Sequence, residues 1–526
     1  MNKMQVRWPL FFAIAMVLGM WMGYRLSRNI PEGQGFFDRP RKSSVQEVID
    51  LLNKKYVDSV ASDSLTEVAI QSLLENLDPH TIYIPAAETA EANEDLQGNF
   101  EGIGVEFMIL QDTVNAVSII PEGPSEKAGL QVGDKFIKVN NNPVTGKSID
   151  SDKIKKLLRG AGGSSVNVMV LRNQKLLSVN ITRGMVPKPS VDASYMITPE
   201  TGFIHLNKFS KTTYEEFMAS LEGLKSKGMK ELILDLRGNG GGLLDEAVDI
   251  ADEFLDSTRL IVYTEGLHTP RQEYICKRPG EFEKGKLTLL IDEFSASASE
   301  VLAGALQDWD RATIIGRRSF GKGLVQEAFS LHNGAQLRLT VAKYYTPIGR
   351  NIQKSYKNGN TAYHDEILDR IHNGAAQTDS SYSQGKKFRT LLKNRIVYGG
   401  GGIKPDIIVS LDTTQRSASY HAFFKEQRIS QFVYRYFVAH NDSFKNFKDA
   451  PSFVKGFKID GLLWNELQQF AESFQVNIKQ LSENERALLE QKIYAYLAMQ
   501  CYRLQGYYVV ENGYDEIIKE ALNAKR

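Results

Sequence analysis

The stretch Leu287-Thr-Leu-Leu-Ile-Asp-Glu-Phe-Ser-Ala-Ser-Ala-Ser-Glu-Val-Leu302 decides the fold class. Its short apolar run is typical of a buried strand, its serines and alanines form a turn, and a helical pattern begins at its end. Glu231-Leu-Ile-Leu-Asp-Leu236 is a second apolar run, which glycines and another helical pattern follow. Repeated strand–turn–helix units predict an α/β core, which we place at residues 190–412, with function at the carboxyl ends of its strands.

Two residues have the chemistry of a nucleophile and its base. Ser297, in the turn of the first stretch, could be the nucleophile, and Lys322 could be the base. Lys322 lies 25 residues later, within Gly321-Lys-Gly-Leu-Val-Gln326, a spacing that a helix and a returning strand can close. A serine needs a base to become a nucleophile, and a lysine can be that base where burial keeps it neutral. Gln326 could orient the amine by a hydrogen bond. The pattern predicts a Ser–Lys hydrolase site.

Each of these residues also has a purely structural interpretation. Ser297-x-x-Glu300 fits a capping box, and such boxes usually do no more than begin a helix. Ser295 and Ser299 compete with Ser297 as the nucleophile. Lys322 would be an ordinary exposed lysine if its loop pointed to solvent. The residue types alone therefore leave the assignment open.

A glycine-rich turn, Asp235-Leu-Arg-Gly-Asn-Gly-Gly-Gly-Leu243, follows the second apolar run. Such a turn lets backbone N–H groups approach a substrate oxygen closely. We expect Gly242, with Gly241 as the alternative, to supply one donor of an oxyanion hole. The amide of Ala298, at a helix N-terminus, is expected to supply the other. The polar side chains of the turn are expected to hold it together: Asp235, Arg237 and Asn239.

A separate group of short strands and turns lies ahead of the core. Gly102-Ile-Gly-Val105 opens it, a Gly-Pro-Ser-Glu-Lys-Ala-Gly-Leu segment follows within Pro121–Asp134, and Val166–Leu171 forms a closing strand. In this order the pieces resemble a PDZ domain over residues 98–185. PDZ domains capture a peptide C-terminus by strand addition, and loop amides hold its carboxylate. The resemblance implies that the substrate C-terminus binds at one loop, although its glycines would also suit a simple tight turn. That loop consists of Gly102, Ile103, Gly104 and Val105.

Together with Tyr345-Thr-Pro-Ile-Gly349 and Gly402-Ile-Lys-Pro-Asp406, these motifs resemble the carboxy-terminal processing proteases over about residues 43–412. The resemblance implies an α+β and α/β multidomain chain, with a ClpP/crotonase-like α/β protease core, an inserted PDZ domain and helical terminal segments. It implies a serine endopeptidase that recognises proteins by a free, apolar C-terminal tail, for C-terminal processing or degradation of exported proteins. It implies no metal and no cofactor. The implied roles are nucleophile for Ser297, general base for Lys322, positioning of the lysine for Gln326, and oxyanion hole for the amides of Gly242 and Ala298.

The N-terminus carries a membrane-targeting pattern, because Lys3 and Arg7 precede an apolar run over residues 8–24. We expect a transmembrane anchor, with a cleaved signal segment as the alternative. Either predicts the bacterial cell envelope, with the catalytic part in the periplasm, anchored in the inner membrane or released by cleavage. The remaining segments are expected to be a short tail (1–7), a linker (25–42), an N-terminal helical segment (43–97), an insertion (about 351–397) and a C-terminal helical extension (413–526).

Composition and motif spacing argue against other classes. The net charge of +1 gives no indication of nucleic-acid binding. Cys276 and Cys501 match no metal spacing and cannot form a disulfide framework, while a single bridge between them stays open. Gly316–Lys322 fits the start of a phosphate-binding loop, but Gly323 stands where that motif needs Ser or Thr.

Two rival functions remain. In a Ser–His–Asp hydrolase, His205 and His332 would be the histidines to test, although no G-x-S-x-G turn surrounds any serine. In a PDZ scaffold, an inactive protease core would bind tails without cleaving them. The expected partners are protein substrates and the membrane. Amphipathic stripes within residues 45–74 would also suit a homodimer, and an adaptor protein is a further candidate partner.

Overall fold

The computed structural model describes residues 8–28, 43–147, 149–256, 258–372, 385–412 and 414–524. The chain forms two compact units, which meet in sequence between Leu73 and Leu74. The predicted N-terminal tail (1–7) lies outside the described residues, as do residues 29–42 of the predicted linker and 373–384 of the predicted insertion.

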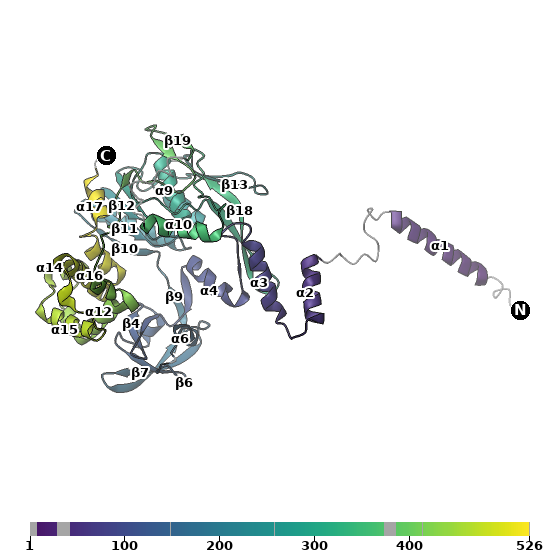
Figure 1. The fold of residues 1–526 in the computed structure, drawn as a ribbon. Helices are drawn as coiled ribbons and strands as arrows, with labels where there is room; N and C mark the ends of the chain where they lie inside the picture. The colour runs from purple at the N-terminus through teal and green to yellow at the C-terminus, as the bar shows by residue number, and fades with distance from the viewer. Residues whose placement is uncertain are drawn as a thin grey trace. The chain divides into compact units, whose positions relative to one another are not determined.

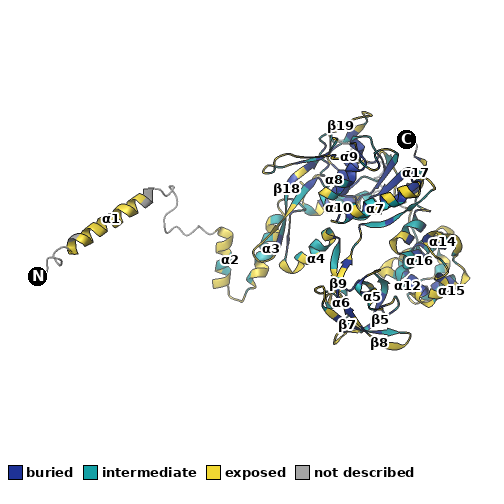
Figure 2. Ribbon diagram, turned by 180° about the vertical axis from the view of Figure 1, so that it is seen from behind, coloured by how far each residue is buried: buried dark blue, intermediate teal, exposed yellow. Residues whose placement is uncertain are grey.

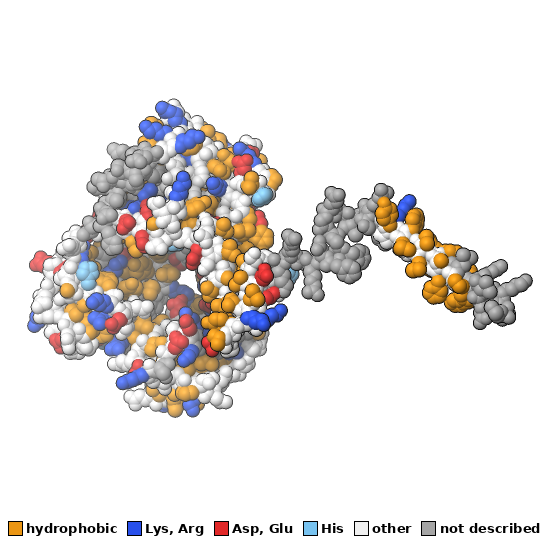
Figure 3. All heavy atoms as spheres, turned by 45° about the vertical axis from the view of Figure 1, so that its right-hand side comes forward, with side chains coloured by type: hydrophobic (Ala, Val, Ile, Leu, Met, Phe, Trp, Pro, Cys, Tyr) orange, Lys and Arg blue, Asp and Glu red, His pale blue; other side chains and the backbone are white. Residues whose placement is uncertain are grey.

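Helices make up the described part of the N-terminal unit. α1 (Trp8–Arg28) exposes apolar side chains along its length, which are orange in Figure 3. α2 (Ser44–Lys55) begins at Ser43, whose side chain accepts a hydrogen bond from the Gln46 N–H, and α3 (Ser62–Leu74) follows. The predicted transmembrane anchor is not supported, because no helix among the described residues is both long enough and apolar enough to cross a membrane.

A six-stranded sheet carries the core of the second unit (Figure 1), and its strand order is β10-β11-β12-β15-β16-β21. β10 is antiparallel to β11, and the remaining neighbours are parallel. The two apolar runs noted above form β12 and β15, which pair from Glu231↔Lys286 to Asp235↔Leu290. The predicted α/β core is confirmed. Its strands are β10 (Val191–Met196), β11 (Thr201–Leu206), β12 (Glu231–Asp235), β15 (Lys286–Ile291), β16 (Thr313–Gly316) and β21 (Ile407–Ile408).

Helices cover both faces of this sheet. Successive side chains of a strand point to opposite faces, so neighbouring residues of β12 pack against different helices. Leu232 and Leu234 pack in the cluster that contains α7, α8 and α9, whereas Ile233 packs in the cluster that contains α17. These buried residues are dark blue in Figure 2. The sequence places the last helix in an extension outside the core, but the structure packs it on the core sheet. The four helices are α7 (Thr213–Ser226), α8 (Leu244–Asp252), α9 (Ala298–Asp308) and α17 (Glu516–Asn523).

A second sheet, in the order β1-β18-β13-β14 with β17 also on β18, lies beside this core. Its first strand comes from the segment predicted to be helical, and it pairs antiparallel to β18 from Ile82↔Arg338 to Ile84↔Gln336. The insertion contributes α10 and the two-stranded sheet of β19 and β20. The elements are β1 (Ile82–Ile84), α4 (Ala86–Gln97), β13 (Leu260–Glu265), β14 (Gln272–Ile275), β17 (Leu324–Ser330), β18 (Gln336–Tyr345), α10 (Asn360–His372), β19 (Lys387–Arg389) and β20 (Ile396–Tyr398).

The PDZ-like region forms its own sheet, in the order β3-β4-β5-β7-β8 with β6 on β5, around a separate apolar core. The first and last strands of the region, β2 and β9, form a separate antiparallel pair. β3 lies at the edge of the sheet, so one side of its backbone pairs with no other strand of this sheet. The elements are β2 (Asn99–Gly102), β3 (Val105–Leu110), β4 (Thr113–Ile119), α5 (Pro124–Lys127), β5 (Lys135–Val139), β6 (Asn142–Pro143), α6 (Ser151–Leu158), β7 (Ser165–Arg172), β8 (Lys175–Thr182) and β9 (Gly184–Pro187).

The C-terminal segment is helical, as predicted, and its helices share an aromatic-rich core. Its longest helix, α16, is interrupted at Tyr502 and Arg503, where Arg503 has φ 58°. The same segment contacts the PDZ-like region, since the Arg503 side chain donates to the Ile119 carbonyl. The elements are α11 (Ala418–Ala422), η2 (Lys425–Gln427), α12 (Arg428–Ala439), α13 (Asn441–Phe444), α14 (Ala450–Gly456), α15 (Gly461–Glu472), η3 (Ile478–Gln480) and α16 (Glu483–Glu511).

Candidate active site

A cavity of about 390 Å³ lies where the turns that follow β12 and β15 meet the start of β17. Apolar side chains from four separate elements form part of its wall, among them Leu96, Leu244, Val301 and Leu324. All five residues that the sequence predicts for catalysis and the oxyanion hole line this one cavity: Ser297, Lys322, Gln326, Gly242 and Ala298.

Among the three serines of the turn, the geometry separates Ser297 from its neighbours. Ser295 and Ser299 are fully buried, and their hydroxyls donate to the carbonyls of Leu236 (2.8 Å) and Asn239 (2.9 Å). Ser297 is partly exposed and lines the cavity, at the N-cap of α9, with φ 56° and ψ −115°. Backbone strain of this kind costs about 1–3 kcal/mol and is found preferentially at functional sites. Of the three, Ser297 is therefore placed to meet a substrate.

Lys322 extends from the loop between β16 and β17, and a strand rather than a helix follows it, unlike in a phosphate-binding loop. Burial lowers the pKa of the Lys322 amine below its usual range, and Arg338 acts in the same direction, while Glu300 and Asp78 oppose the shift. Among the described residues no hydrogen bond joins this amine to the Ser297 hydroxyl. Catalytic hydrogen bonds often form only when substrate binds.

Glu300 joins the serine turn to the lysine loop. Its carboxylate is fully buried and accepts hydrogen bonds from the backbone N–H groups of Ser297 (2.9 Å), Gly321 (2.8 Å) and Lys322 (2.8 Å), and from the Ser319 hydroxyl (2.5 Å). Burial raises the pKa of Glu300 to about 7, although all four hydrogen bonds favour the ionised form. The sequence identifies only the capping contact to Ser297, because the other three donors lie about twenty residues away.

Glu300→Gln should therefore separate the two loops. Each oxygen of the Glu300 carboxylate accepts two hydrogen bonds. In glutamine an –NH2 group, which cannot accept a hydrogen bond, replaces one of these oxygens, so two donors would lose their acceptor. We expect a loss of about 1–3 kcal/mol in unfolding free energy for the unsatisfied donors, and about a 100-fold fall in kcat from the displaced serine and lysine. Thermal unfolding and peptide cleavage measure the two effects.

Glu253→Gln is the matched control for this variant, since Glu253 is a buried carboxylate that accepts from the Glu281 N–H at 2.8 Å and does not line the cavity. It should lose stability while keeping kcat within about threefold, because it leaves both loops in place. Equal kcat losses in the two variants would mean that Glu300 acts only through stability.

The glycine turn and the start of α9 bring two backbone amides to the cavity beside Ser297, those of Gly242 and Ala298. The Gly241 N–H is already used, because it donates to the Asn239 side-chain oxygen at 2.9 Å. Among the described residues, no hydrogen bond occupies the N–H of Gly242 or the N–H of Ala298. A Cβ atom on Gly241 would lie 2.7 Å from the Ser297 Cβ, which shows how closely the turn approaches the serine. The arrangement suits an oxyanion hole built from these two amides.

Gly242 cannot carry a side chain in this backbone conformation. Its φ is +145°, and a Cβ atom would lie 2.0 Å from the Phe209 carbonyl oxygen. Gly242→Ala should therefore displace the turn and lower kcat by about 100-fold, the cost of losing one oxyanion donor. Gly266→Ala is the control, because its Cβ would meet the Val341 oxygen at 2.3 Å, outside the cavity. Steady-state peptide cleavage, at a temperature where both variants are folded, measures the difference in kcat between them. An unchanged kcat in Gly242→Ala would contradict the assignment of Gly242 as an oxyanion donor.

Gln326 lines the cavity, but its predicted role in orienting Lys322 stays a prediction. Its side-chain nitrogen is buried without a hydrogen-bond partner in the described part of the chain. Tyr344 is a site residue that sequence patterns did not indicate. Its hydroxyl donates to the carbonyls of both Ser297 (3.1 Å) and Lys322, and so joins the two loops a second time.

The histidines singled out by the sequence lie away from the cavity. His205 is buried against Tyr508, whose hydroxyl shares a hydrogen bond with its Nε2 at 2.9 Å, and His332 is exposed. His80 lies closer to the lysine loop, and burial, followed by the charge of Lys322, lowers its pKa to about 4. Its Nε2 shares a hydrogen bond with the Tyr363 hydroxyl rather than with a serine. No Ser–His–Asp arrangement is formed around Ser297 by the described residues.

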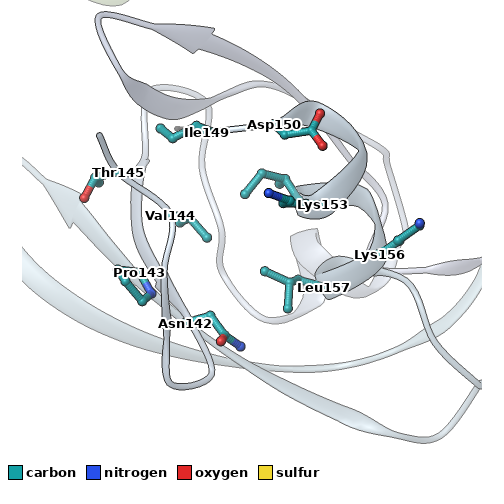
Figure 4. Close-up of a pocket in the computed structure, with 10 residues that line it drawn as sticks. Asn142, Pro143, Val144, Thr145, Ile149, Asp150, Lys153, Lys156 and Leu157 are labelled. Atoms are coloured by element: carbon teal, nitrogen blue, oxygen red, sulfur yellow. The ribbon is translucent and has the colours of Figure 1, made fainter. Parts of the chain in front are cut away.

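The loop predicted to bind the substrate C-terminus lies between β2 and β3. Ile103 is buried, and its carbonyl accepts from the Ser125 N–H at 2.8 Å, while Gly104 adopts φ +73°. A cavity of about 470 Å³ in the same region lies between α6 and residues 142–145 (Figure 4), and the predicted loop is not part of its wall.

Metal and disulfide chemistry have no support in the described residues. No group of three or more His, Cys, Asp and Glu side chains in these ranges is arranged to hold a metal ion. Cys276 is buried and Cys501 is half-buried, and both are free thiols, so the bridge that the sequence leaves open is not formed.

Three parts of the chain match known protein families. Residues 200–360 match the family described as Peptidase family S41, and residues 116–172 match the PDZ domain. Residues 419–503, in the C-terminal helical segment, match a family of unknown function.

Curated relatives described as CtpA-like serine proteases match over much of the chain. A "Probable CtpA-like serine protease" of Staphylococcus epidermidis is 34% identical over 316 residues, which are 60% of this chain and 64% of the relative. The protein of the same description from Staphylococcus haemolyticus is 31% identical over 395 residues, which are 75% of this chain and 78% of the relative. The chain thus spans slightly less than two thirds of the first relative's length.

Solved structures of similar proteins include two with related descriptions. The photosystem II D1 C-terminal processing protease has a TM-score of 0.35 and 25% identity, covering 69% of this chain and 92% of that one. The PDZ domain of a carboxy-terminal protease from Vibrio cholerae, in complex with a peptide, has a TM-score of 0.16 and 28% identity, covering 17% and 97%.

Proposed function

Since this chain belongs to peptidase family S41, the C-terminal processing proteases, we propose that it is a serine endopeptidase with a Ser297–Lys322 dyad. The observation that carries the proposal is the single cavity into which Ser297, Lys322 and the amides of Gly242 and Ala298 converge. The serine and lysine come from different loops, and the buried Glu300 carboxylate joins those loops.

The proposed reaction proceeds through an acyl-enzyme. Neutral Lys322 takes the proton from the Ser297 hydroxyl, and the serine oxygen attacks the carbonyl carbon of the scissile peptide bond. The amides of Gly242 and Ala298 hold the oxyanion that develops. The protonated lysine then returns a proton to the leaving amine, and water, activated by the neutral lysine, releases the acyl group. All of these groups belong to the chain itself.

We further propose that the substrate is a protein recognised by a free, apolar C-terminal tail. β3 is an edge strand that begins at Val105, directly after the loop Gly102–Gly104, so a tail could add to the sheet with its carboxylate at that loop. The apolar wall of the active-site cavity suits an apolar segment near the scissile bond. The relatives are bacterial, and we place the activity in a bacterial cell envelope, on exported proteins.

A PDZ scaffold on an inactive core is the alternative to be tested. An inactive core would not need to retain the nucleophile, the base and both oxyanion amides in one cavity, so the geometry favours the enzyme. A homodimer formed through residues 45–74, or an adaptor protein, stays a prediction.

Cleavage of a tailed substrate tests the proposal. The full chain is incubated with a loosely folded protein that ends in apolar residues, and products are identified by mass spectrometry. The same protein with an amidated C-terminus is the control for tail capture. Cleavage of the free-tail form at a higher kcat/KM, by about tenfold or more, supports the proposal. Binding of the tail without any product would favour the scaffold, and equal cleavage of both forms would contradict tail recognition.

A further inference from the structure

The C-terminal segment reaches the glycine turn through one ion pair. The Asp515 carboxylate accepts a hydrogen bond from the Arg237 guanidinium at 2.6 Å, and the two side chains are only 22% and 18% exposed. Asp515 lies 278 residues further along the chain, at the N-cap of α17. A partly buried, charge-assisted contact of this kind is stronger than an ordinary surface pair.

Arg237 belongs to the turn that carries the Gly242 amide. Its Nε and second terminal nitrogen bind both oxygens of the buried Asp235, at 2.6–3.0 Å, and its other terminal nitrogen binds Asp515. The guanidinium is thus held between a carboxylate of β12 and a carboxylate of the C-terminal segment. Because a guanidinium is planar, hydrogen bonds to both of its terminal nitrogens also fix its orientation.

Other contacts hold the rest of the turn to the core. The Gly238 N–H donates to Asp292 at 3.0 Å, and the Asn239 side chain donates to the Leu206 carbonyl at 2.9 Å. Both partners belong to the core sheet and its loops. Arg237 is the residue of the turn that contacts the C-terminal segment through Asp515.

The position of Asp515 is fixed independently of this ion pair. Ile517 and Ile518 of α17 are buried in the apolar cluster on the core sheet. Just upstream, the Tyr508 hydroxyl bonds to His205, and the Asn512 side chain donates to the Tyr195 hydroxyl at 2.8 Å. The carboxylate is therefore presented to Arg237 by a docked segment rather than by a mobile tail.

We propose that Asp515 is a positioning residue for the oxyanion hole. It holds Arg237, and with it the backbone path that presents the Gly242 amide to the cavity, so the C-terminal segment completes the active site. The inference rests on the proposed function, because it assigns Asp515 a part in that reaction. It concerns turnover rather than tail binding, since the ion pair lies in the core and not at the PDZ-like region.

Asp515→Asn tests this role with little effect on the helix. The Asp515 side chain also accepts from the Ile517 N–H at 2.8 Å, and asparagine caps helices as well as aspartate does. The variant thus removes the charge that holds Arg237 and keeps the cap. Asp460→Asn is the matched control, because Asp460 caps α15 in the same segment by accepting from the Leu463 N–H at 3.0 Å.

Two measurements on the full chain decide the outcome. In cleavage of a short peptide with an apolar free C-terminus, Asp515→Asn should lower kcat about tenfold with KM within about twofold. Hydrogen exchange of the amides at residues 238–242 should become faster, by about tenfold, in Asp515→Asn but not in Asp460→Asn. Both results together support the inference.

The inference would be overturned if Asp515→Asn had the same exchange rates and the same kcat as the Asp460→Asn control. A lower kcat without faster exchange at residues 238–242 would overturn it as well. Failure of the proposed function looks different. In that case the unmodified chain shows no cleavage that depends on Ser297, while the exchange experiment still decides whether Asp515 holds the turn.

Discussion

Ser297→Ala is expected to abolish peptide cleavage, with a fall in kcat of at least ~10³-fold, because no acyl-enzyme can form without the hydroxyl. The neighbouring hydroxyls cannot replace it, since Ser295 and Ser299 are fully buried and donate to backbone carbonyls. The loss should appear in kcat, with tail binding unchanged, because Ser297 lies in the core cavity and not in the PDZ-like region. Product formation followed by mass spectrometry, together with binding of the tail peptide, separates the two.

Ser299→Ala is the matched control in the same turn. It removes the hydrogen bond to the Asn239 carbonyl and should cost about 1 kcal/mol of unfolding free energy. It should keep kcat within about tenfold, because the Ser299 hydroxyl does not reach the cavity. A Ser299→Ala variant as inactive as Ser297→Ala, while both are folded, would count against Ser297 as the nucleophile.

Lys322→Ala should lower kcat by about 10³-fold, since a general base commonly contributes 10²–10⁴-fold. Lys322→Arg should be similarly inactive, although it keeps the positive charge, because arginine does not lose its proton in the working range. The arginine variant thus separates a base from a cation that only binds substrate. Activity retained in Lys322→Arg would contradict the assignment.

Lys322, as the proposed base, also predicts a pH dependence of the reaction. Burial lowers the pKa of Lys322 below the usual lysine range, and only the neutral amine accepts the serine proton. As pH falls through this lowered pKa the amine becomes protonated, so kcat should fall on the acid side and rise toward alkaline pH. A kcat profile that stays flat as pH falls well into the acid range would mean that lysine is not the base.

Local patterns predicted much of the core. The runs that became β12 and β15 are short and apolar, and turn residues follow them, so their burial and their turns could be predicted from the local sequence. The placement of Ser297 at the start of a helix followed from the same pattern, as did the glycine turn. These features depend on residues near each other in the chain.

Several contacts between distant parts of the chain were not predicted from the sequence. β1 has three residues, too few for a periodic signal, and its strand conformation depends on pairing with β18. α17 lies in the extension that was predicted to be helical as a whole (413–526), but nothing in its own pattern says that it packs on the core sheet. Glu300 was assigned to a cap, since its contacts to Gly321 and Lys322 exist only when the two loops meet.

Location of the acyl group tests the central claim most directly. The full chain is mixed with an activated ester of a short apolar peptide, the reaction is stopped in acid, and the modified residue is found by tandem mass spectrometry. The Ser297–Lys322 dyad predicts one acyl group on Ser297, strongly reduced in Lys322→Ala and absent from Ser297→Ala. Peptide cleavage with the acyl group on another residue, or undiminished in Ser297→Ala, would contradict it.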